Sequence, residues 1–175
     1  MVLLIGIDPG IVDTGLVAIE LYPESGTYHV EHRVWRDVTE QIDKTLIVKE
    51  DFLTHLVAEV DKLKSTSRSA MKLVGIEGYR NRGRDIRQDQ RMTMLVQTIH
   101  KRLDRSMVID NTGIKNVVTQ PILGLFDFYF PGTNHADLWS AARIALKLGL
   151  SDLRINETLS DMVRAHVNGR SWESV

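Results

Sequence analysis

Three acidic residues stand at positions from which their carboxylates could act together. Asp8 ends the apolar run VLLIGI, Glu77 ends a second apolar run, KLVGI, and Asp137 falls in the first turn of a predicted helix. A carboxylate at the end of a buried strand is costly unless it is paired or bound to a cation. Two strand ends and a helix N-terminus meeting at one sheet edge would make an oxygen-rich site of the kind that Mg²⁺ prefers.

Such a site suggests phosphodiester chemistry. Two metal ions about 4 Å apart can clamp a phosphodiester, one activating a water molecule and the other stabilising the leaving oxygen. For each acid taken singly, a capped loop or a salt bridge is the alternative. The three together favour the metal site, and their convergence depends on the fold.

The elements that must position these acids can be read from the hydrophobic pattern. Short apolar or alternating runs predict five strands, at residues 2–8, 14–21, 27–36, 72–77 and 106–110. Apolar residues at helical spacing predict four helices, at residues 40–64, 86–104, 134–148 and 157–167. Residues 116–119 are expected to extend or follow the fifth strand, and residues 121–133 have no assignment.

The element order β-β-β-α-β-α-β-α predicts an α/β fold, a mixed five-stranded sheet with helices on both faces. The first and fourth strands are expected to lie side by side, so that Asp8 and Glu77 share one edge. The 175 residues contain no linker, which predicts a single domain over residues 1–175. From about residue 151 we expect a short C-terminal helix and tail.

The composition excludes several classes of protein. Hydrophobic residues make up 43% and charged residues 26%, as in ordinary globular chains. Without cysteine there is no disulfide framework and no thiolate metal site. No apolar run approaches the roughly 18 residues of a membrane span, and the apolar start lacks the basic region of a secretion signal. We therefore expect a cytoplasmic protein.

The charge is unevenly distributed along the chain. The formal net charge is −1, yet residues 80–105 contain eight Lys or Arg and only three Asp. Such a local excess is typical of a surface that binds a polyanion. A solvated, Arg-rich helix is the equal alternative.

One segment carries a more specific signal. GIDPGIVDTG at residues 6–15 lacks the Gly-Lys-Ser/Thr of a Walker loop. It resembles the first motif, GIDPGxxxTG, of the RuvC-type Holliday-junction resolvases of the RNase H-like superfamily. Gly75-Ile76-Glu77 resembles their second motif, and HADLWSAARIAL at residues 135–146 resembles their third. The resemblance spans residues 3–148, and the short, divergent form is similar to phage-type members.

The resemblance implies an RNase H-like fold and a homodimeric endonuclease that depends on Mg²⁺, with Mn²⁺ as a substitute. Such an enzyme resolves four-way DNA junctions by paired symmetric nicks during DNA recombination and repair. Asp8, Glu77 and Asp137 would be its catalytic residues and would hold the metal ions.

A fourth ligand is usual in this family, three residues before the last acid. That position is Asn134 here, which could equally cap the helix, and the neighbouring His135 is the other catalytic candidate. If Asp137 fills the earlier position instead, Ser140 stands where the last acid would be.

The resemblance also implies a DNA-binding surface beside the second motif. The family places an aromatic residue shortly after the Glu, where it can stack on bases, and Tyr79 is the candidate; a packed tyrosine is the alternative. Four arginines that would neutralise phosphates follow it: Arg80, Arg82, Arg84 and Arg87. The bacterial enzymes have a basic helical stretch in the place of residues 111–133. Here Lys115 is the one basic residue of this segment, which also contains several aromatic residues.

Three other functions compete with junction resolution. Sugar kinases and chaperone ATPases begin with a similar acidic glycine turn, but they need two such domains and a longer chain. A broader nuclease of branched DNA would use the same site. A junction-binding protein that has lost cleavage would keep the fold and the basic surface.

Overall fold

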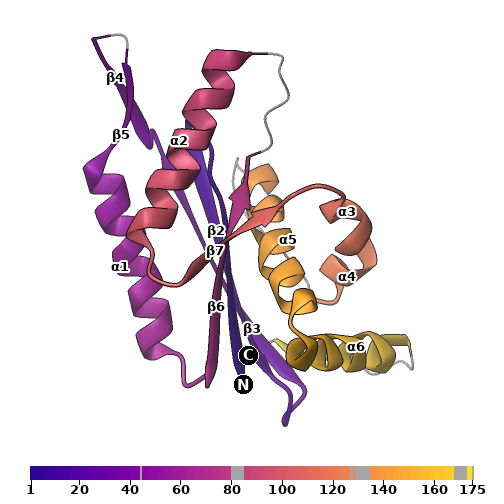
Figure 1. Ribbon diagram of the computed structural model, residues 1–175. Helices are drawn as coiled ribbons and strands as arrows, with labels where there is room; N and C mark the ends of the chain where they lie inside the picture. The colour runs from indigo at the N-terminus through magenta and orange to yellow at the C-terminus, as the bar shows by residue number, and fades with distance from the viewer. Residues whose placement is uncertain (44, 80–84, 127, 129–134, 168–172, 175) are drawn as a thin grey trace.

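The computed structural model describes residues 1–43, 45–79, 85–126, 128, 135–167 and 173–174. Its centre is a mixed sheet with the strand order β7-β6-β1-β2-β3-β8 (Figure 1). The first three strands form an antiparallel meander: β1 (Val2–Asp8), β2 (Asp13–Tyr22) and β3 (Thr27–Arg36). Three further strands pair in parallel with their neighbours: β6 (Met71–Gly78), β7 (Ser106–Asp110) and β8 (Glu173–Ser174).

The five strands and the mixed topology predicted from the sequence are confirmed, and the two-residue β8 adds a sixth at the edge. Helices cover both faces of the sheet (Figure 1). On one side lie α1 (Glu50–Thr66) and α2 (Ile86–Arg102). On the other side lie α3 (Ile114–Val117), α4 (Gln120–Gly124), α5 (His135–Ser151) and α6 (Leu153–Val167). Within the described ranges, no helix combines the length and apolarity needed to cross a bilayer.

Strand alternation divides the core into two layers. In β1, Leu3, Ile5 and Ile7 join the hydrophobic cluster beneath α1 and α2. Leu4 joins the cluster beneath α5 and α6. By the same period of two, Asp8 falls on the α5 side of the sheet, at the end of β1.

The long helix predicted over residues 40–64 is wrong in its first part. Residues Thr39–Ile42 and Thr45–Val48 form the hairpin β4–β5, and α1 begins only at Glu50. The spacing of Ile42 and Leu46 fits a helix, but the run Thr45–Val48 is rich in β-branched residues that favour a strand. Asp43, at φ 46°, turns the chain between the two strands.

The strand suggested for residues 116–119 is also wrong. Gly113 adopts φ 66°, and its carbonyl accepts hydrogen bonds from the backbone N–H groups of Asn116 and Val117. These bonds turn the chain into α3 immediately after β7. The β-branched pair Val117-Val118 therefore lies at the end of a helical turn and in the loop after it, where Val118 packs into the core under α5.

Helix α5 packs directly on the sheet backbone at two glycines. A Cβ atom on Gly6 would lie 2.0 Å from the carbonyl oxygen of Ala141 and 2.6 Å from the nitrogen of Ala145. A Cβ atom on Gly15 would lie 2.9 Å from the carbonyl carbon and oxygen of Asp137. Glycine at both positions therefore sets how closely the first half of α5 approaches the ends of β1 and β2.

We expect Gly6→Ala to destabilise the protein, because the added methyl group meets the backbone of α5 rather than a movable side chain. Overpacking of this kind costs about 1–3 kcal/mol, or roughly 2–12 °C in Tm for a chain of this size. Gly124→Ala is the matched control, since a Cβ atom at Gly124 has no neighbour within 4 Å. Thermal unfolding of the two variants tests this, and equal Tm values would contradict the tight contact.

Candidate functional site

Strand register brings Asp8 and Glu77 side by side. The last pair of the parallel β1–β6 ladder is Ile7 with Ile76, and each strand continues by one acidic residue. Both acids follow residues that face α1 and α2, so both point to the α5 side of the sheet. Their side chains are hydrogen-bonded to each other. The sequence analysis expected this shared edge, which lies at the top of Figure 1, where β6 ends.

Helix α5 adds two more polar groups above this pair. Gly15, the partner of Asp8 in the β1–β2 ladder, lies under the backbone of Asp137. Asp137 is therefore held over the strand next to Asp8, in the first turn of α5. One turn further along, Ser140 hydrogen-bonds to the Asp8 side chain.

Burial and neighbouring charges change the acidity of this group. Burial raises the pKa of Asp8 to about 9, helped by the charge of Glu77, the hydrogen bond to Glu77 and the charge of Asp137, and opposed by Ser140. Burial among these acids therefore favours the protonated form of Asp8. The pKa of Asp137 is also raised, by burial first and then by the charges of Asp13 and Glu77.

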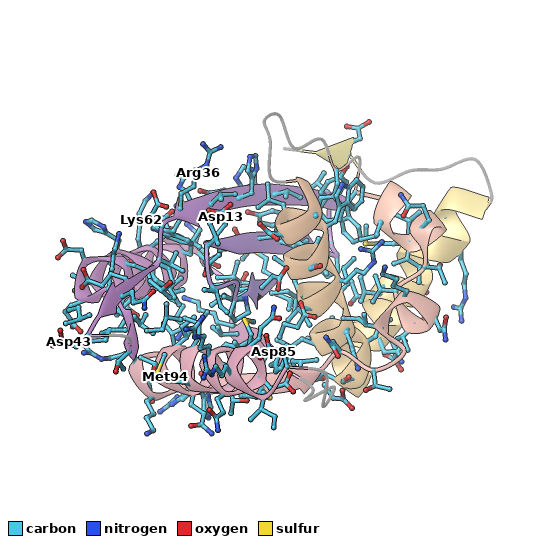
Figure 2. All side chains as sticks on the ribbon, turned by 90° about the horizontal axis from the view of Figure 1, so that it is seen from above. Asp13, Arg36, Asp43, Lys62, Asp85 and Met94 are labelled. Atoms are coloured by element: carbon cyan, nitrogen blue, oxygen red, sulfur yellow. The ribbon has the colours of Figure 1, made fainter. Side chains whose placement is uncertain are left out.

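Asp13 also belongs to this neighbourhood, because its charge acts on the pKa of Asp137. It precedes Gly15 by two residues on β2 and so lies on the same face of the sheet, towards the N-terminus of α5. Figure 2 looks down on this end and places Asp13 beside Arg36, its partner in the β2–β3 ladder. Asp13 is thus a fourth carboxylate near the end of the sheet.

Sequence reasoning missed Asn111, which follows β7. Its Nδ2 donates a 2.6 Å hydrogen bond to Oε1 of Glu77. No motif marks this asparagine; its relevance comes from the register of β6 and β7, in which Glu77 pairs with Ile109. Glu77 is therefore contacted from both neighbouring strands, by Asp8 from β1 and by Asn111 beyond β7.

The donors of this end of the sheet fit a hard cation. They are carboxylate, hydroxyl and amide oxygens, the ligand types of Mg²⁺ and Mn²⁺. In the part of the chain that the structure describes, no three His, Asp or Glu side chains already form a cation cage. Asp8 and Glu77 are hydrogen-bonded to each other, and the charge of Asp137 acts on the pKa of Asp8. These residues would hold a divalent cation once Asp8 gives up its proton.

The remaining predicted site residues fall outside this cluster or outside the described residues. Arg80, Arg82, Arg84 and Asn134 lie outside them, and of His135 only its place as the first residue of α5 is described. Tyr79 packs partly against the core under α1 and α2, and its hydroxyl donates a 2.5 Å hydrogen bond to the buried Asp89. Arg87 is exposed in the first turn of α2.

A groove of about 550 Å³ lies at the ends of β6 and β7, lined by Gly78, Tyr79, Val108, Asp110 and Thr112. In the β6–β7 ladder Val108 pairs with Ile76 and Asp110 with Gly78, so these lining residues face the α1 and α2 side of the sheet, opposite to Glu77. Tyr79 thus has one side against the core and another on this groove, and a role for its ring in base stacking stays a prediction.

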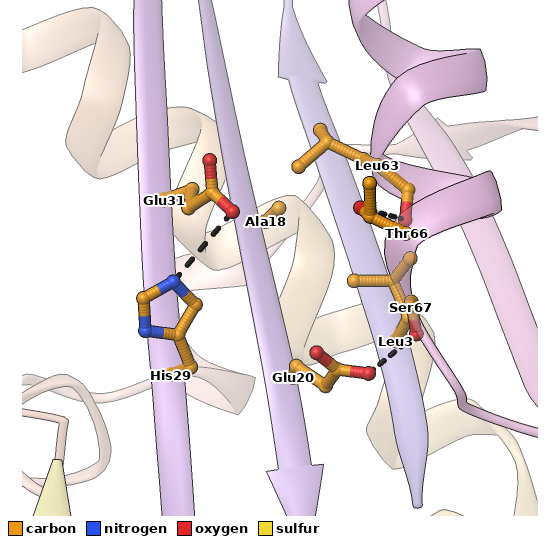
Figure 3. A pocket seen from close by; sticks show the side chains of 8 residues that line it. All are labelled: Leu3, Ala18, Glu20, His29, Glu31, Leu63, Thr66 and Ser67. Carbon is orange, nitrogen blue, oxygen red and sulfur yellow. Dashed lines mark hydrogen bonds and ion pairs between the residues drawn. The ribbon is translucent and has the colours of Figure 1, made fainter. Parts of the chain in front are cut away.

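A second pocket, of about 220 Å³, lies at the opposite end of the sheet (Figure 3). Glu20, one of the two carboxylates that line it, accepts hydrogen bonds from Ser67, from Ser69 at 2.7 Å and from Tyr22 at 2.8 Å. Burial works to raise the pKa of Glu20, but these hydroxyl donors outweigh it and the pKa is lowered. Hydroxyl groups of the protein thus satisfy Glu20, and Glu31 pairs with His29 at 3.6 Å, which favours a structural role for this pocket.

The raised pKa of Asp8 makes the stability of the metal-free protein depend on pH. The folded protein keeps the proton of Asp8, whereas the unfolded chain loses it near the ordinary value of 3.8. The free energy of unfolding should therefore fall as the pH rises from about 4 to about 9. Asp8→Asn removes this titration, so the metal-free variant should have the higher Tm at pH 8.

Chemical denaturation of both proteins in EDTA between pH 5 and pH 9 measures the effect. A pH profile of the wild type that is parallel to that of the variant would show that Asp8 is ionised in the folded protein. In that case the proton would not lie between Asp8 and Glu77.

Two solved structures share this architecture. RuvC of Thermus thermophilus in complex with a Holliday junction substrate superimposes with a TM-score of 0.53 and 13% sequence identity, over 93% of this chain and 96% of that one. A second Thermus thermophilus RuvC structure gives a TM-score of 0.50 and 13% identity, over 92% and 96%.

Sequence comparison adds nothing to this likeness. No protein-family model matches the chain, and no curated protein sequence matches it. At 13% identity the structural similarity establishes the fold and leaves the chemistry to the residues of this chain. The protein has the α/β fold of RuvC, with a mixed sheet whose parallel strand ends carry two acids in contact.

Proposed function

We propose that this protein is a metal-dependent endonuclease that resolves four-way DNA junctions by paired symmetric nicks. The observation that carries the proposal is the contact between Asp8 and Glu77 under the N-terminal turn of α5, in a fold shared with RuvC. A phosphodiester nuclease needs clustered oxygen ligands, and Asp8, Glu77 and Asp137 would supply them at this edge.

The acids would have distinct roles in this reaction. A divalent metal, when bound, would activate water and stabilise the charge of the leaving oxygen. Asp8 and Glu77 would hold it from adjacent strands, with Asp137 above them. Ser140 orients Asp8 through its hydrogen bond, which favours the ionised form of that carboxylate. Asn134 and His135, next to the start of α5, are our candidates for the fourth ligand.

The basic segment after β6 would guide the DNA. Arg80, Arg82, Arg84 and Arg87 follow Glu77 within ten residues, so they would neutralise phosphates close to the acids. Tyr79, two residues after Glu77 and on the groove at the ends of β6 and β7, would meet bases at the junction centre. Paired nicks in two strands require two active sites, and we therefore propose a homodimer as the working form.

A junction-binding protein without cleavage is the second candidate. The observation in its favour is that, among the described residues, no three acidic or histidine side chains are gathered into a formed cation site. This candidate predicts the same affinity for junction DNA as the nuclease does, but no cleavage product. Cleavage is therefore the measurement that separates the two candidates.

The test is a cleavage assay with an end-labelled four-way junction and a linear duplex of matched sequence, each with Mg²⁺, Mn²⁺ or EDTA. We expect symmetric nicks in the junction alone, only with metal. Asp8→Asn should reduce cutting to the level of the EDTA control while it leaves junction binding intact. The stability of this variant, measured separately, excludes unfolding as the reason.

Other results of this assay would change the proposal. Nicks in flaps or linear duplexes would indicate a broader nuclease of branched DNA. Tight binding with no cutting under either metal would favour the junction-binding protein. Normal cutting by Asp8→Asn would place the catalytic centre elsewhere.

Arg87 offers a separate test of the DNA-binding surface. Its backbone N–H is bonded to the side chain of Asp85, which caps α2, so the helix does not depend on the guanidinium. If Arg87 neutralises one phosphate, Arg87→Ala should lower the slope of log K against log salt by about 0.9. Arg164→Ala is the control, because Arg164 lies on α6 and pairs with Asp161 at 3.1 Å. An unchanged slope for Arg87→Ala would remove this residue from the DNA interface.

A further inference from the structure

We propose that Asn111 is a positioning residue that orients Glu77 for binding a divalent cation. The inference rests on the proposed function, since it concerns the same site. It adds a residue that lies outside the three motifs and that is supplied by the turn after the edge strand β7.

Parallel pairing explains why Asn111 reaches Glu77. Glu77 and Ile109 are partners in the β6–β7 ladder, and partners in a parallel ladder point to the same face. Asn111 is two residues beyond Ile109 and thus continues that face past the end of β7. Its side chain meets the carboxylate across the strand ends, with 2.6 Å between Nδ2 and Oε1.

The chemistry of the amide suits this task. An ionised carboxylate only accepts hydrogen bonds, so the NH₂ group of Asn111 must be the group that faces it. The donor is neutral, and it fixes the carboxylate without adding a positive charge that would compete with a cation. A lysine or arginine at this place would hold Glu77 equally well but would repel the metal.

The turn that carries Asn111 is itself fixed from both sides. Oδ1 of Asp110 accepts hydrogen bonds from the backbone N–H of Thr112 at 2.9 Å and from its hydroxyl at 2.7 Å. The Lys147 ammonium of α5 donates to the carbonyl oxygen of Asp110. The amide of Asn111 is therefore presented by an ordered backbone, as an orienting group requires.

The first experiment measures cation affinity without DNA. Mn²⁺ is titrated into the metal-free wild type, Asn111→Leu and Asn111→Ala at one pH, and the bound ion is followed by calorimetry or electron paramagnetic resonance. Loss of a group that orients a ligand typically weakens metal binding about 10–100-fold. We expect this loss in both variants, because leucine keeps the volume of the side chain but not its donor. Asn116→Leu, the same exchange at an exposed position in α3, is the matched control.

A second readout separates positioning from a structural role. With saturating junction, the cleavage rate of Asn111→Leu should be low at the Mn²⁺ concentration that saturates the wild type and should recover at higher Mn²⁺. Tm and junction affinity should stay at the values of the Asn116→Leu control. Wild-type Mn²⁺ affinity in both Asn111 variants would overturn the proposal.

The failure of this inference and the failure of the proposed function look different. If the wild type binds Mn²⁺ and cuts junctions, Asp8→Asn loses both, and the Asn111 variants keep both, only the role of Asn111 is refuted. If the wild type itself takes up no Mn²⁺, both proposals fail together. If Asn111→Leu is unstable, Asn111→Ala decides, since a shorter side chain at a half-exposed turn introduces no clash.

Discussion

The contact between α5 and the backbone of the central strands is the constraint on which the rest of the structure depends. Gly6 and Gly15 leave no room for a side chain under this helix, so its axis lies closer to the sheet than side-chain packing would allow. Because Gly15 is the ladder partner of Asp8, the same close approach carries Asp137 to the end of β1. Gly6 and Gly15 of the first motif thus allow α5 to approach the acids closely, and they do not form a phosphate-binding loop.

Parallel pairing decides which groups meet at that edge. Three neighbouring strands, β1, β6 and β7, run in the same direction, and their C-terminal ends contribute Asp8, Glu77 and Asn111 in that order across the sheet. Glu77, on the middle strand of the three, therefore has a hydrogen-bonding partner on each side. Ligand sites in α/β sheets generally lie at the carboxyl ends of parallel strands, because the residues that leave such strands are free to converge there. The antiparallel strand β2 contributes from its beginning instead, through Asp13.

What could be predicted from the sequence follows from this geometry. Short apolar runs that end in an acid indicate both the strand and the carboxylate at its end, so the positions of Asp8 and Glu77 could be predicted from the sequence. The hairpin at residues 39–48 could not be predicted in this way. The spacing of Ile42 and Leu46 is compatible with a helix and equally with positions on two strands. The role of Asn111 could not be predicted either, because its contact with Glu77 follows from the pairing of β6 with β7, which the sequence pattern does not reveal.

The surroundings of two carboxylates on strands, Glu20 and Asp8, differ in a way that distinguishes a structural residue from a functional one. Glu20 on β2 receives three hydroxyl donors, and its pKa is lowered, so the protein has satisfied that charge on its own. Asp8 is more deeply buried, and among the described residues the groups that act on its pKa are two further acids and one serine, with no cation. If Asp8 served stability alone, we would expect hydrogen-bond donors or a cation beside it, like the hydroxyl donors around Glu20. An acid kept buried beside other acids gains most from a cation supplied from outside, and this imbalance is the physical reason to look for catalysis at this edge.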